Sequence, residues 1–439
     1  METKFTYQRI WHNSWILHQK KSNVMIKRTF FLMVVVVIFS SCATHKYSQI
    51  NHAKFYQTDY PGNVFKSTVF NTSDSISELF VQVNLNALSV LSGQSKAEIL
   101  NSYVFDYSLL DGAKEKVVLQ SGQVKISDSP DANESFASFK IKLKTLQGNQ
   151  FVLFSSIESL AQQKAYTTRT NILKGVSYSE QNFMLLNEDG SIHWDNFVRD
   201  EEKIVVKVND ASIKELFISW YAPKFSPAVV PFTPVRPDEI KNLKGNEPFK
   251  VVLLDGKTPP LSFKDLGIYS FHLDANQNQG ISVYKFFKEY PFVATDAQRL
   301  FTLRYLNPRF EFEELMAMEP SEAVHQFWYS KSRKQERSED MIRTYYNRVQ
   351  RANELFTSYK EGWKTDRGMI FMIYGPPEKV FKFKDREVWE YGRDAFYSGL
   401  RFQFNKIENP YSQNDFRLLR EAFYEPSWQG IVNNWRTDI

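Results

Sequence analysis

The chain has 439 residues, of which 42% are hydrophobic, 24% charged and 15% aromatic. This is the composition of a globular protein with room for several domains, and it excludes a disordered, collagenous or low-complexity chain. The formal net charge is +5, from 55 lysines and arginines against 50 aspartates and glutamates. Residues 1–41 hold six of the basic residues and one of the acidic ones, so 49 of each sign remain from Cys42 onward. The overall charge therefore gives no support to a basic surface for nucleic acid, and we expect no nucleic-acid partner.

Residues 25–42 have the order of a secretory signal sequence. Lys27 and Arg28 precede an apolar run over residues 30–39, and two serines follow it. Ten helical residues rise about 15 Å, about half the hydrocarbon thickness of a bilayer, which disfavours a spanning helix. Met25 is a better start for this signal than Met1. We therefore expect residues 1–41 to be a signal peptide preceded by a mis-assigned N-terminal extension.

The residue after the two serines is Cys42, the only cysteine of the chain. A single cysteine excludes an intramolecular disulfide, so the exported fold must rely on packing. The position of Cys42 resembles the lipobox of bacterial lipoproteins, and the resemblance implies acylation of this residue and attachment to a membrane. Surface-exposed lipoproteins of Bacteroidota, which this N-terminus resembles, often carry acidic residues next, whereas residues 43–48 contain none. We therefore expect an outer-membrane anchor that faces the periplasm.

The first half of the remaining chain has the two-residue periodicity of β-strands. We expect a lipidated tether over residues 42–54, followed by two β-sandwiches of Ig-like type over residues 55–175 and 176–292. Apolar and polar residues alternate, as they do in strands with one buried face, and Asp-Gly pairs typical of tight hairpin turns follow at 111–112, 189–190 and 255–256. The predicted strands lie at residues 79–85, 103–109, 139–144, 151–155, 203–208 and 216–221.

Five prolines lie between Pro223 and Pro237. This stretch is either the approach to a further pair of strands, at residues 249–254 and 267–273, or a linker between domains.

From about residue 293 the pattern becomes helical, which predicts a C-terminal α+β domain over residues 293–439. Apolar residues in steps of three and four predict a helix of about six turns over residues 341–359, and residues 312–329 also have a helical pattern. The continuous apolar run over residues 369–374, closed by Gly375, predicts a strand buried on both faces. Further strands are expected at residues 388–391 and 400–404. The fold class is thus multidomain, with two all-β sandwiches before the α+β domain.

Residues 362–366, Gly-Trp-Lys-Thr-Asp, resemble the signature of the GWxTD domain, found in exported proteins of Bacteroidota and other bacteria. The resemblance extends over residues 295–439 and implies an exported lipoprotein. Membership of the family implies a fold and a cellular location but no particular activity. The residues that carry it are Gly362, Trp363, Thr365, Asp366, Arg367, Gly368, Gly375, Pro376, Pro377, Trp389 and Tyr391, with Phe327 and Trp328 upstream.

The residue types of this motif predict a structural role. Gly362 follows the long helix, where a left-handed backbone favours glycine, and Trp363 can cover the last helical turn. Thr365 and Asp366 are able to bind backbone amides of the turn, and Asp366 and Arg367 to pair with groups across the sheet.

The alternative is a cleft with Asp366 as a general acid or base. Arg367, Glu390 and His325 would surround it, and an aromatic pocket of Trp363, Trp328 and Trp389 would raise its pKa. The same residue types also suit a groove for a glycan or a peptide. The seven histidines form no metal-ligand spacing, and nucleophile elbows and phosphate- or dinucleotide-binding loops are absent, so we expect neither a metal nor a cofactor.

We therefore expect a lipid-anchored, non-catalytic scaffold or accessory subunit of an envelope assembly, in secretion or outer-membrane biogenesis. Its partners would be the membrane, through Cys42, and an envelope protein. An envelope hydrolase that acts on glycan or peptide is the alternative, and a sugar- or peptide-binding lipoprotein is the third.

Overall fold

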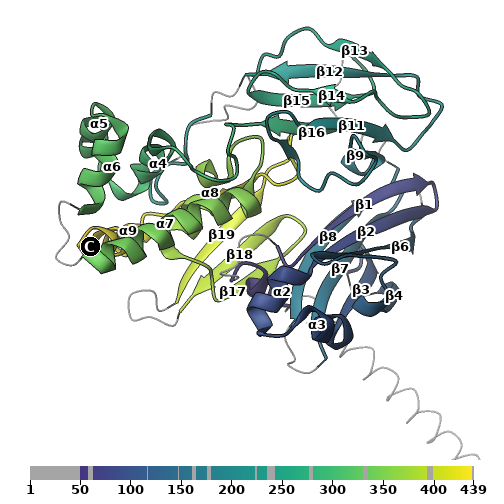
Figure 1. Ribbon diagram of the computed structural model, residues 1–439, viewed down its shortest axis with the longest axis horizontal. Helices are drawn as coiled ribbons and strands as arrows, with labels where there is room; N and C mark the ends of the chain where they lie inside the picture. Colours follow the sequence, from purple (N-terminus) through teal and green to yellow (C-terminus); the bar gives the residue numbers. More distant parts are fainter. Residues whose placement is uncertain are drawn as a thin grey trace, which may run out of the picture.

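The computed structural model contains two β-sheet bodies and a C-terminal body of helices and one sheet (Figure 1). It describes residues 50–57, 63–115, 117–146, 148–160, 165–175, 179–222, 225–234, 243–275, 280–329, 335–392 and 399–437, the side chains of 335–338 excepted. The predicted signal peptide, Cys42 and residues 43–49 of the predicted tether lie outside these ranges. No helix in the part of the chain that the structure describes is both long enough and apolar enough to cross a bilayer.

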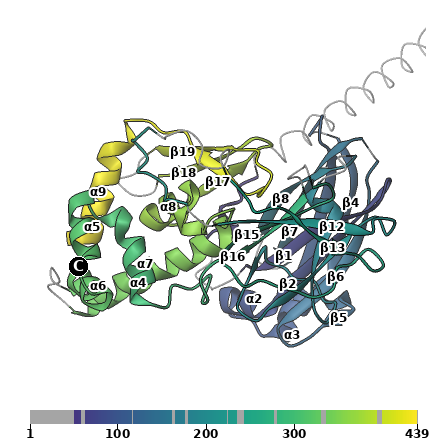
Figure 2. The same cartoon turned by 90° about the horizontal axis from the view of Figure 1, so that it is seen from above.

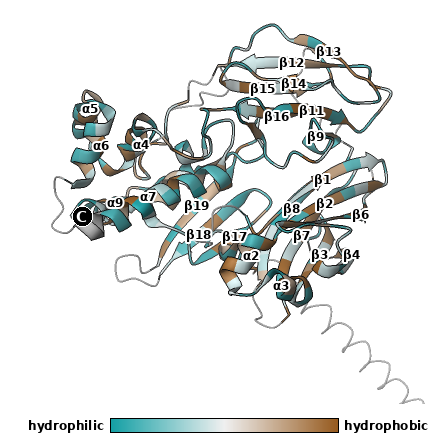
Figure 3. Ribbon diagram, viewed as in Figure 1, coloured by the Kyte–Doolittle hydropathy of each residue, from teal (hydrophilic) through white to brown (hydrophobic). Residues whose placement is uncertain are grey.

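The first body is a sandwich of two four-stranded antiparallel sheets. One shared core holds alternate residues from both sheets, such as Leu79 and Val81 from the first and Phe105 and Leu153 from the second, and apolar residues are interspersed with polar ones along the strands (Figure 3). The predicted strands at residues 103–109, 139–144 and 151–155 are confirmed, and the one at 79–85 is confirmed up to residue 84, because Leu85 begins a helix. The short helices α2 and α3 were not predicted. The first sheet contains, in order, β1 (Phe65–Ser73), β2 (Ile76–Asn84), β6 (Phe136–Lys144) and β5 (Asp131–Ala132). The second sheet contains, in order, β4 (Val118–Lys125), β3 (Tyr103–Asp111), β7 (Gln150–Ser159) and β8 (Ala165–Leu173). Helix α2 spans Leu85–Ser92, and helix α3 spans Lys96–Ser102.

The second body also has two sheets around one core, to which Ile204, Ile218, Phe271 and Val283 contribute. Its pairs are antiparallel apart from the parallel pair of β10 and β16. The predicted turn at 255–256 is a tight one, with both φ angles positive (50° and 70°). The larger sheet contains, in order, β10 (Phe197–Val198), β16 (Gly280–Lys285), β15 (Gly267–His272), β12 (Glu215–Tyr221) and β13 (Phe249–Val252). The smaller sheet contains, in order, β14 (Leu261–Ser262), β11 (Lys203–Val208) and β9 (Phe183–Asn187).

The C-terminal domain packs helices against one face of a four-stranded antiparallel sheet. The predicted long helix is confirmed as α7, which buries Tyr345, Val349, Ala352 and Phe356 completely. Figure 2 shows α4, α5, α6 and α9 at the end of the molecule away from both sandwiches. The sheet order is β17 (Lys379–Lys382), β18 (Arg386–Tyr391), β19 (Leu400–Lys406) and β20 (Phe416–Leu418); the helices are α4 (Asp296–Thr302), η5 (Leu303–Leu306), α5 (Arg309–Met316), α6 (Pro320–Tyr329), α7 (Gln335–Phe356), η6 (Gly362–Lys364), α8 (Asp366–Tyr374) and α9 (Tyr424–Thr437).

Two predictions for this domain were wrong. Residues 369–374 are part of helix α8, not a strand. All nine residues of α8 are buried, so the apolar run has no polar side that would reveal a helical period. The residues at its two ends identify it as a helix: Thr365 is the N-cap, and Gly375, with φ of 84°, ends it. The predicted helix at 312–329 is two helices, α5 and α6, and α6 begins at Pro320, where proline fits the first helical turn.

Residues 50–54 are not part of a free tether. His52 donates its backbone N–H to the Val380 carbonyl of β17 (2.8 Å), and its ring nitrogen lies 2.9 Å from the Thr167 carbonyl of β8. His52, Ala53 and Tyr56 are all buried, the last two in the core of the C-terminal domain. Burial also lowers the pKa of His52 to about 4. The segment 50–57, with the short helix η1 (Ala53–Phe55), therefore joins the first sandwich to the C-terminal domain.

The importance of this segment can be tested at Tyr56, whose ring lies 5.7 Å from that of Phe356 and 5.5 Å from that of Trp389. We expect Tyr56→Ala to lower the free energy of unfolding by about 3–5 kcal/mol, as truncation of a buried aromatic residue does. Lys54→Ala, at an exposed position of the same segment, should change it by less than about 0.5 kcal/mol. Urea titration measures both, and a parent-like Tyr56→Ala variant would show that the segment is not part of the core.

The proline-rich stretch is not a free linker in its described part. Residues 225–234 cross the C-terminal domain, where Ala228, Val230 and Phe232 pack against the core. The backbone N–H of Ala228 also binds the Lys364 carbonyl (2.9 Å). The second sandwich and the C-terminal domain are therefore joined beside the motif at residues 362–368.

Candidate functional site

Gly362 lies where the segment after α7 contacts that helix most closely. A Cβ atom at this position would lie 2.0 Å from the Ala352 carbonyl oxygen of α7, so only glycine fits. The left-handed backbone that we expected is not the reason, because Gly362 is not among the described residues with positive φ. The residue begins η6, and its N–H donates to the Tyr290 hydroxyl (3.3 Å).

Trp363 is buried between α7 and η5. Its backbone N–H donates to the Asn353 Oδ1 of α7 (3.0 Å), and its carbonyl accepts from the Tyr305 hydroxyl (3.2 Å). The indole and Tyr305 rings meet edge to face at 6.1 Å. Trp363 therefore anchors the segment after α7 to two elements at once.

Thr365 and Gly368 complete a close turn. The Thr365 hydroxyl donates to the Gly362 carbonyl (2.7 Å) and accepts from the Gly368 N–H (3.0 Å), which makes Thr365 the N-cap of α8. A Cβ atom on Gly368 would lie 1.9 Å from the Gly362 carbonyl oxygen. The two glycines are thus required by the same approach of η6 to α8.

Asp366 binds distant groups rather than amides of its own turn. Its Oδ2 accepts from the Leu418 backbone N–H (2.8 Å) and from one Arg420 nitrogen (2.9 Å), and its Oδ1 accepts from the other (2.6 Å). Side-chain exposure is 9% for Asp366 and 7% for Arg420. Arg420 also donates to the Val229 carbonyl of the proline-rich stretch (3.0 Å). The carboxylate therefore fixes α8, the end of β20 and residues 225–234 together.

Arg367 and Glu387 form a second buried pair. Arg367 Nη1 lies 3.0 Å from Glu387 Oε1, Nη2 donates to the Asn414 carbonyl (2.9 Å), and the guanidinium lies over the Phe416 ring at 4.2 Å. Glu387 Oε2 accepts from Trp389 Nε1 (3.2 Å) and from the Tyr56 hydroxyl (3.4 Å). Burial raises the pKa of Glu387, but the charges of Arg367 and Lys382 outweigh it, and the pKa is lowered. Both residues are therefore charged parts of the core.

The model of the GWxTD domain family matches residues 267–437. A GWxTD domain is present in this chain. The match begins at the first residue of β15, earlier than the expected residue 295, so the GWxTD domain includes the two adjacent strands β15 and β16 of the second sandwich. No curated protein matches the chain.

The GWxTD domain does not bring the other candidate residues to Asp366. Glu390 lies on the opposite face of the sheet from Glu387 and is near Lys379 (3.7 Å) and Arg401 (3.9 Å). His325 is exposed on α6, with its ring 4.8 Å from that of Tyr329. Trp328, Trp363 and Trp389 are buried against different neighbours, Tyr345, Tyr305 and Phe356 in turn, rather than around one carboxylate. Within the described residues, no three histidine, cysteine or acidic side chains are grouped as a metal ion requires.

Prediction from sequence missed Glu387, Arg420 and Tyr56. One signal was available for Glu387: it shares a strand face with Trp389 and Tyr391, and a charged residue in an apolar row requires a buried partner. Arg420 and Tyr56 lie far from the motif in sequence, and no local pattern indicates their contacts.

The Asp366 pair predicts a stability defect. We expect Asp366→Asn to lower the free energy of unfolding by about 3–5 kcal/mol, because it leaves the buried Arg420 charge without its counterion. Asp385→Asn is the control: that carboxylate is 72% exposed and 3.1 Å from Arg386, and the change should be below about 1 kcal/mol. Thermal and urea unfolding measure both. An unchanged melt for Asp366→Asn would instead leave this residue available for chemistry.

Asp415 predicts the pH dependence of the same region. Burial, with a smaller contribution from the nearby Asp366 charge, raises the pKa of Asp415 to about 6. A raised carboxyl pKa stabilises the fold below the unfolded-state pKa of about 4, and this contribution is lost as the pH rises through 6. Asp415→Asn keeps an acceptor for Asn409 (3.0 Å), so it should reduce the fall in stability between pH 4 and 6.5 by about 2–3 kcal/mol. Burial raises the pKa of Glu180 to about 6 as well, so part of the fall remains in the variant. Urea titrations across this range test the prediction, and a fall as large in Asp415→Asn as in the parent would contradict it.

Proposed function

We propose that this chain is a lipid-anchored outer-membrane protein that faces the periplasm and acts as a non-catalytic scaffold or accessory subunit of an envelope assembly. The proposed localisation rests on the signal-like residues 25–41 and on Cys42. Two sandwich modules, which we take to be Ig-like, and the GWxTD domain would together present surfaces to a partner protein in secretion or outer-membrane biogenesis.

The observation that carries the non-catalytic role is the bonding of Asp366. Both carboxylate oxygens are bound by Arg420, and one of them also by the Leu418 N–H. A general acid or base must be able to release its proton to a substrate or take one from it, whereas this carboxylate holds three parts of the fold together. This favours the scaffold over the hydrolase with Asp366 in its site.

The proposal is tested by affinity purification of the full chain from envelopes in mild detergent, followed by quantitative mass spectrometry. We expect an envelope membrane protein in stoichiometric amount, retained by the parent chain and lost from an Asp366→Asn variant only in proportion to its unfolded fraction. Absence of such a protein, together with hydrolysis of glycan or peptide by the purified chain that Asp366→Asn abolishes without lowering its melting temperature, would overturn the scaffold in favour of the enzyme.

A further inference from the structure

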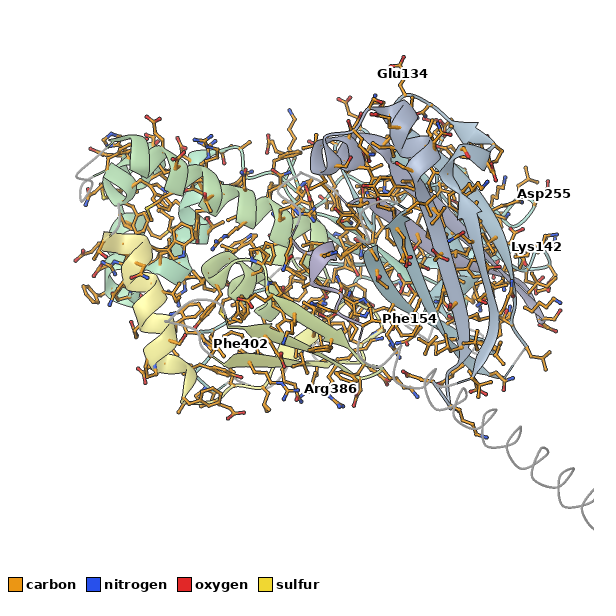
Figure 4. All side chains as sticks on the ribbon, turned by 90° about the horizontal axis from the view of Figure 1, so that it is seen from below. Glu134, Lys142, Phe154, Asp255, Arg386 and Phe402 are labelled. Atoms are coloured by element: carbon orange, nitrogen blue, oxygen red, sulfur yellow. The ribbon has the colours of Figure 1, made fainter. Side chains whose placement is uncertain are left out.

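One face of the C-terminal sheet is not covered by α7 and α8. Along β18, Glu387, Trp389 and Tyr391 point toward these helices, so Arg386, Val388 and Glu390 lie on the other side, which we call the outer face. Val388 is buried, whereas the charged residues on either side of it are partly exposed. Cross-strand pairing adds Lys379 and Arg401, the two residues opposite Glu390. Figure 4 shows Arg386 at the border of the molecule, beyond the strands as seen from the helices.

The outer face carries an excess of positive charge at exposed positions. The side chains of Arg401, Lys379 and Arg386 are 62%, 57% and 39% exposed. A single carboxylate, that of Glu390, lies near both Lys379 and Arg401, at 3.7 and 3.9 Å. At the adjoining hairpin tip, Asp385 pairs with Arg386 (3.1 Å), and the exposed Lys384 adds one further positive charge that equals the charge of Asp385. Three basic groups against one acidic group leave a charge of +2 on a chain that is neutral from Cys42 onward.

The described chain also begins beside this sheet. Ile50 packs against Leu110, Val152 and Phe154 of the first sandwich, and the next residues run along the edge strand β17, where His52 binds Val380. Between Cys42 and Ile50 the chain advances by eight residues, which reach at most about 27 Å when fully extended. Two further residues lead to His52, which binds β17, so an acylated Cys42 would hold β17 within about 35 Å of the bilayer.

Proximity of this kind lets a weak attraction set an orientation. A basic side chain near an anionic leaflet contributes about 1 kcal/mol, which is little for free binding in solution but, for an anchored chain, changes the ratio of two orientations about fivefold per charge. The helices cover the other face of the sheet, so the outer face is the side of this domain that presents basic groups and strand edge together.

We infer that the outer face lies against the membrane to which the chain is anchored and that Lys379, Arg386 and Arg401 bind the phosphates of anionic phospholipids. The inference rests on the proposed function for the anchor itself. It adds which side of the protein is turned toward the bilayer, and hence that the second sandwich, with β13 at the far side of the molecule in Figure 1, is turned toward partners.

The test uses the full, lipid-anchored chain in vesicles of phosphatidylethanolamine and phosphatidylglycerol at a ratio of 7:3, with nitroxide on some headgroups. Because Cys42 is the only cysteine and would be acylated, Gln403→Cys on the outer face provides a single thiol for a fluorophore. Lys250→Cys, on β13, provides the reference position. We expect strong quenching at 403 and little at 250, and loss of the difference in vesicles of phosphatidylcholine alone.

Charge reversal separates the outer face from other basic surfaces. Lys379→Glu, Arg386→Glu and Arg401→Glu together should abolish the quenching at 403. The population of the orientation with the outer face on the membrane falls about fivefold for each charge removed. The matched control reverses Lys140, Lys142 and Lys144, three exposed lysines of β6 in the first sandwich. This variant should leave the quenching unchanged.

Flotation with the vesicles distinguishes the two levels of the proposal. A chain that floats but shows equal quenching at 403 and 250, or quenching lost in the β6 variant instead, overturns the orientation and leaves the anchor standing. A chain that does not float, or whose Cys42 thiol is free to react, overturns the anchor and the orientation together.

Discussion

Gly362→Ala is expected to destabilise the C-terminal domain strongly. The new methyl carbon would lie 2.0 Å from the Ala352 carbonyl oxygen and 2.7 Å from the Asn353 Cα. Both are backbone atoms of α7, so no side-chain rotation can relieve the contact, and η6 must separate from the helix. That separation also removes the hydrogen bonds of Gly362 to Tyr290 and of Trp363 to Asn353. We expect a loss of at least about 3 kcal/mol in the free energy of unfolding, at the upper end of overpacking effects.

Gly430→Ala is the matched control for this substitution. Gly430 lies inside α9 (Tyr424–Thr437), and a Cβ there would meet no atom within 4 Å. Alanine in a helix interior stabilises relative to glycine by about 0.5–1 kcal/mol. Urea unfolding of the two variants should therefore give shifts of opposite sign. If Gly362→Ala were as stable as the parent, the close approach of η6 to α7 would be wrong.

Glu387→Gln is expected to cost about 3–5 kcal/mol, because it leaves the Arg367 charge buried without its carboxylate. Glu390→Gln is its control, three residues along the same strand and therefore on the outer face, 35% exposed and 3.7 and 3.9 Å from its cationic neighbours. That change should be below about 1 kcal/mol. Equilibrium unfolding compares the two, and equal effects would show that burial of the Arg367 pair does not matter.

The same pair fixes a pH effect with the opposite sign to that of Asp415. The pKa of Glu387 is lowered, chiefly by Arg367 against the effect of burial. A lowered carboxyl pKa stabilises the fold above the unfolded-state value of about 4.3, and this stability is lost as the pH falls through the folded-state pKa. The parent should therefore lose stability below about pH 4 more steeply than Glu387→Gln does. Acid titration of both, followed by circular dichroism, measures the difference, and parallel curves would contradict it.

Prediction from the sequence succeeded for elements that have one solvent-exposed face. Residues 139–144 alternate between apolar residues and lysines, and α7 has a polar side, so their periods are visible. Residues 366–374 are buried on every side, which removes the period, and the cap at Thr365 was the better evidence for a helix. The segment 50–57 was expected to be tether up to residue 54 because it is short and polar. Its burial depends on β8 and β17, which are distant in sequence.

The candidate site was predictable in its residues but not in its contacts. The motif indicated that Gly362, Thr365 and Asp366 matter, and turn chemistry indicated that Thr365 binds a backbone amide, although in a turn before a strand and not at the start of a helix. The reason for Gly362 is the distance to α7, and the partner of Asp366 is Arg420, 54 residues away. Both depend on how α7, α8 and β20 pack in three dimensions. No local pattern encodes them.

The double-mutant cycle of Asp366→Asn and Arg420→Gln tests most directly the central claim that the motif holds the fold together. Urea unfolding of the parent, the two single variants and the double variant gives the coupling energy of the pair. We predict a coupling of about 2–3 kcal/mol, in the upper range for residues in direct contact, with the double variant more stable than the sum of the single effects implies. A coupling near zero would contradict the account, because Asp366 would then be free of the structural role on which the scaffold proposal depends.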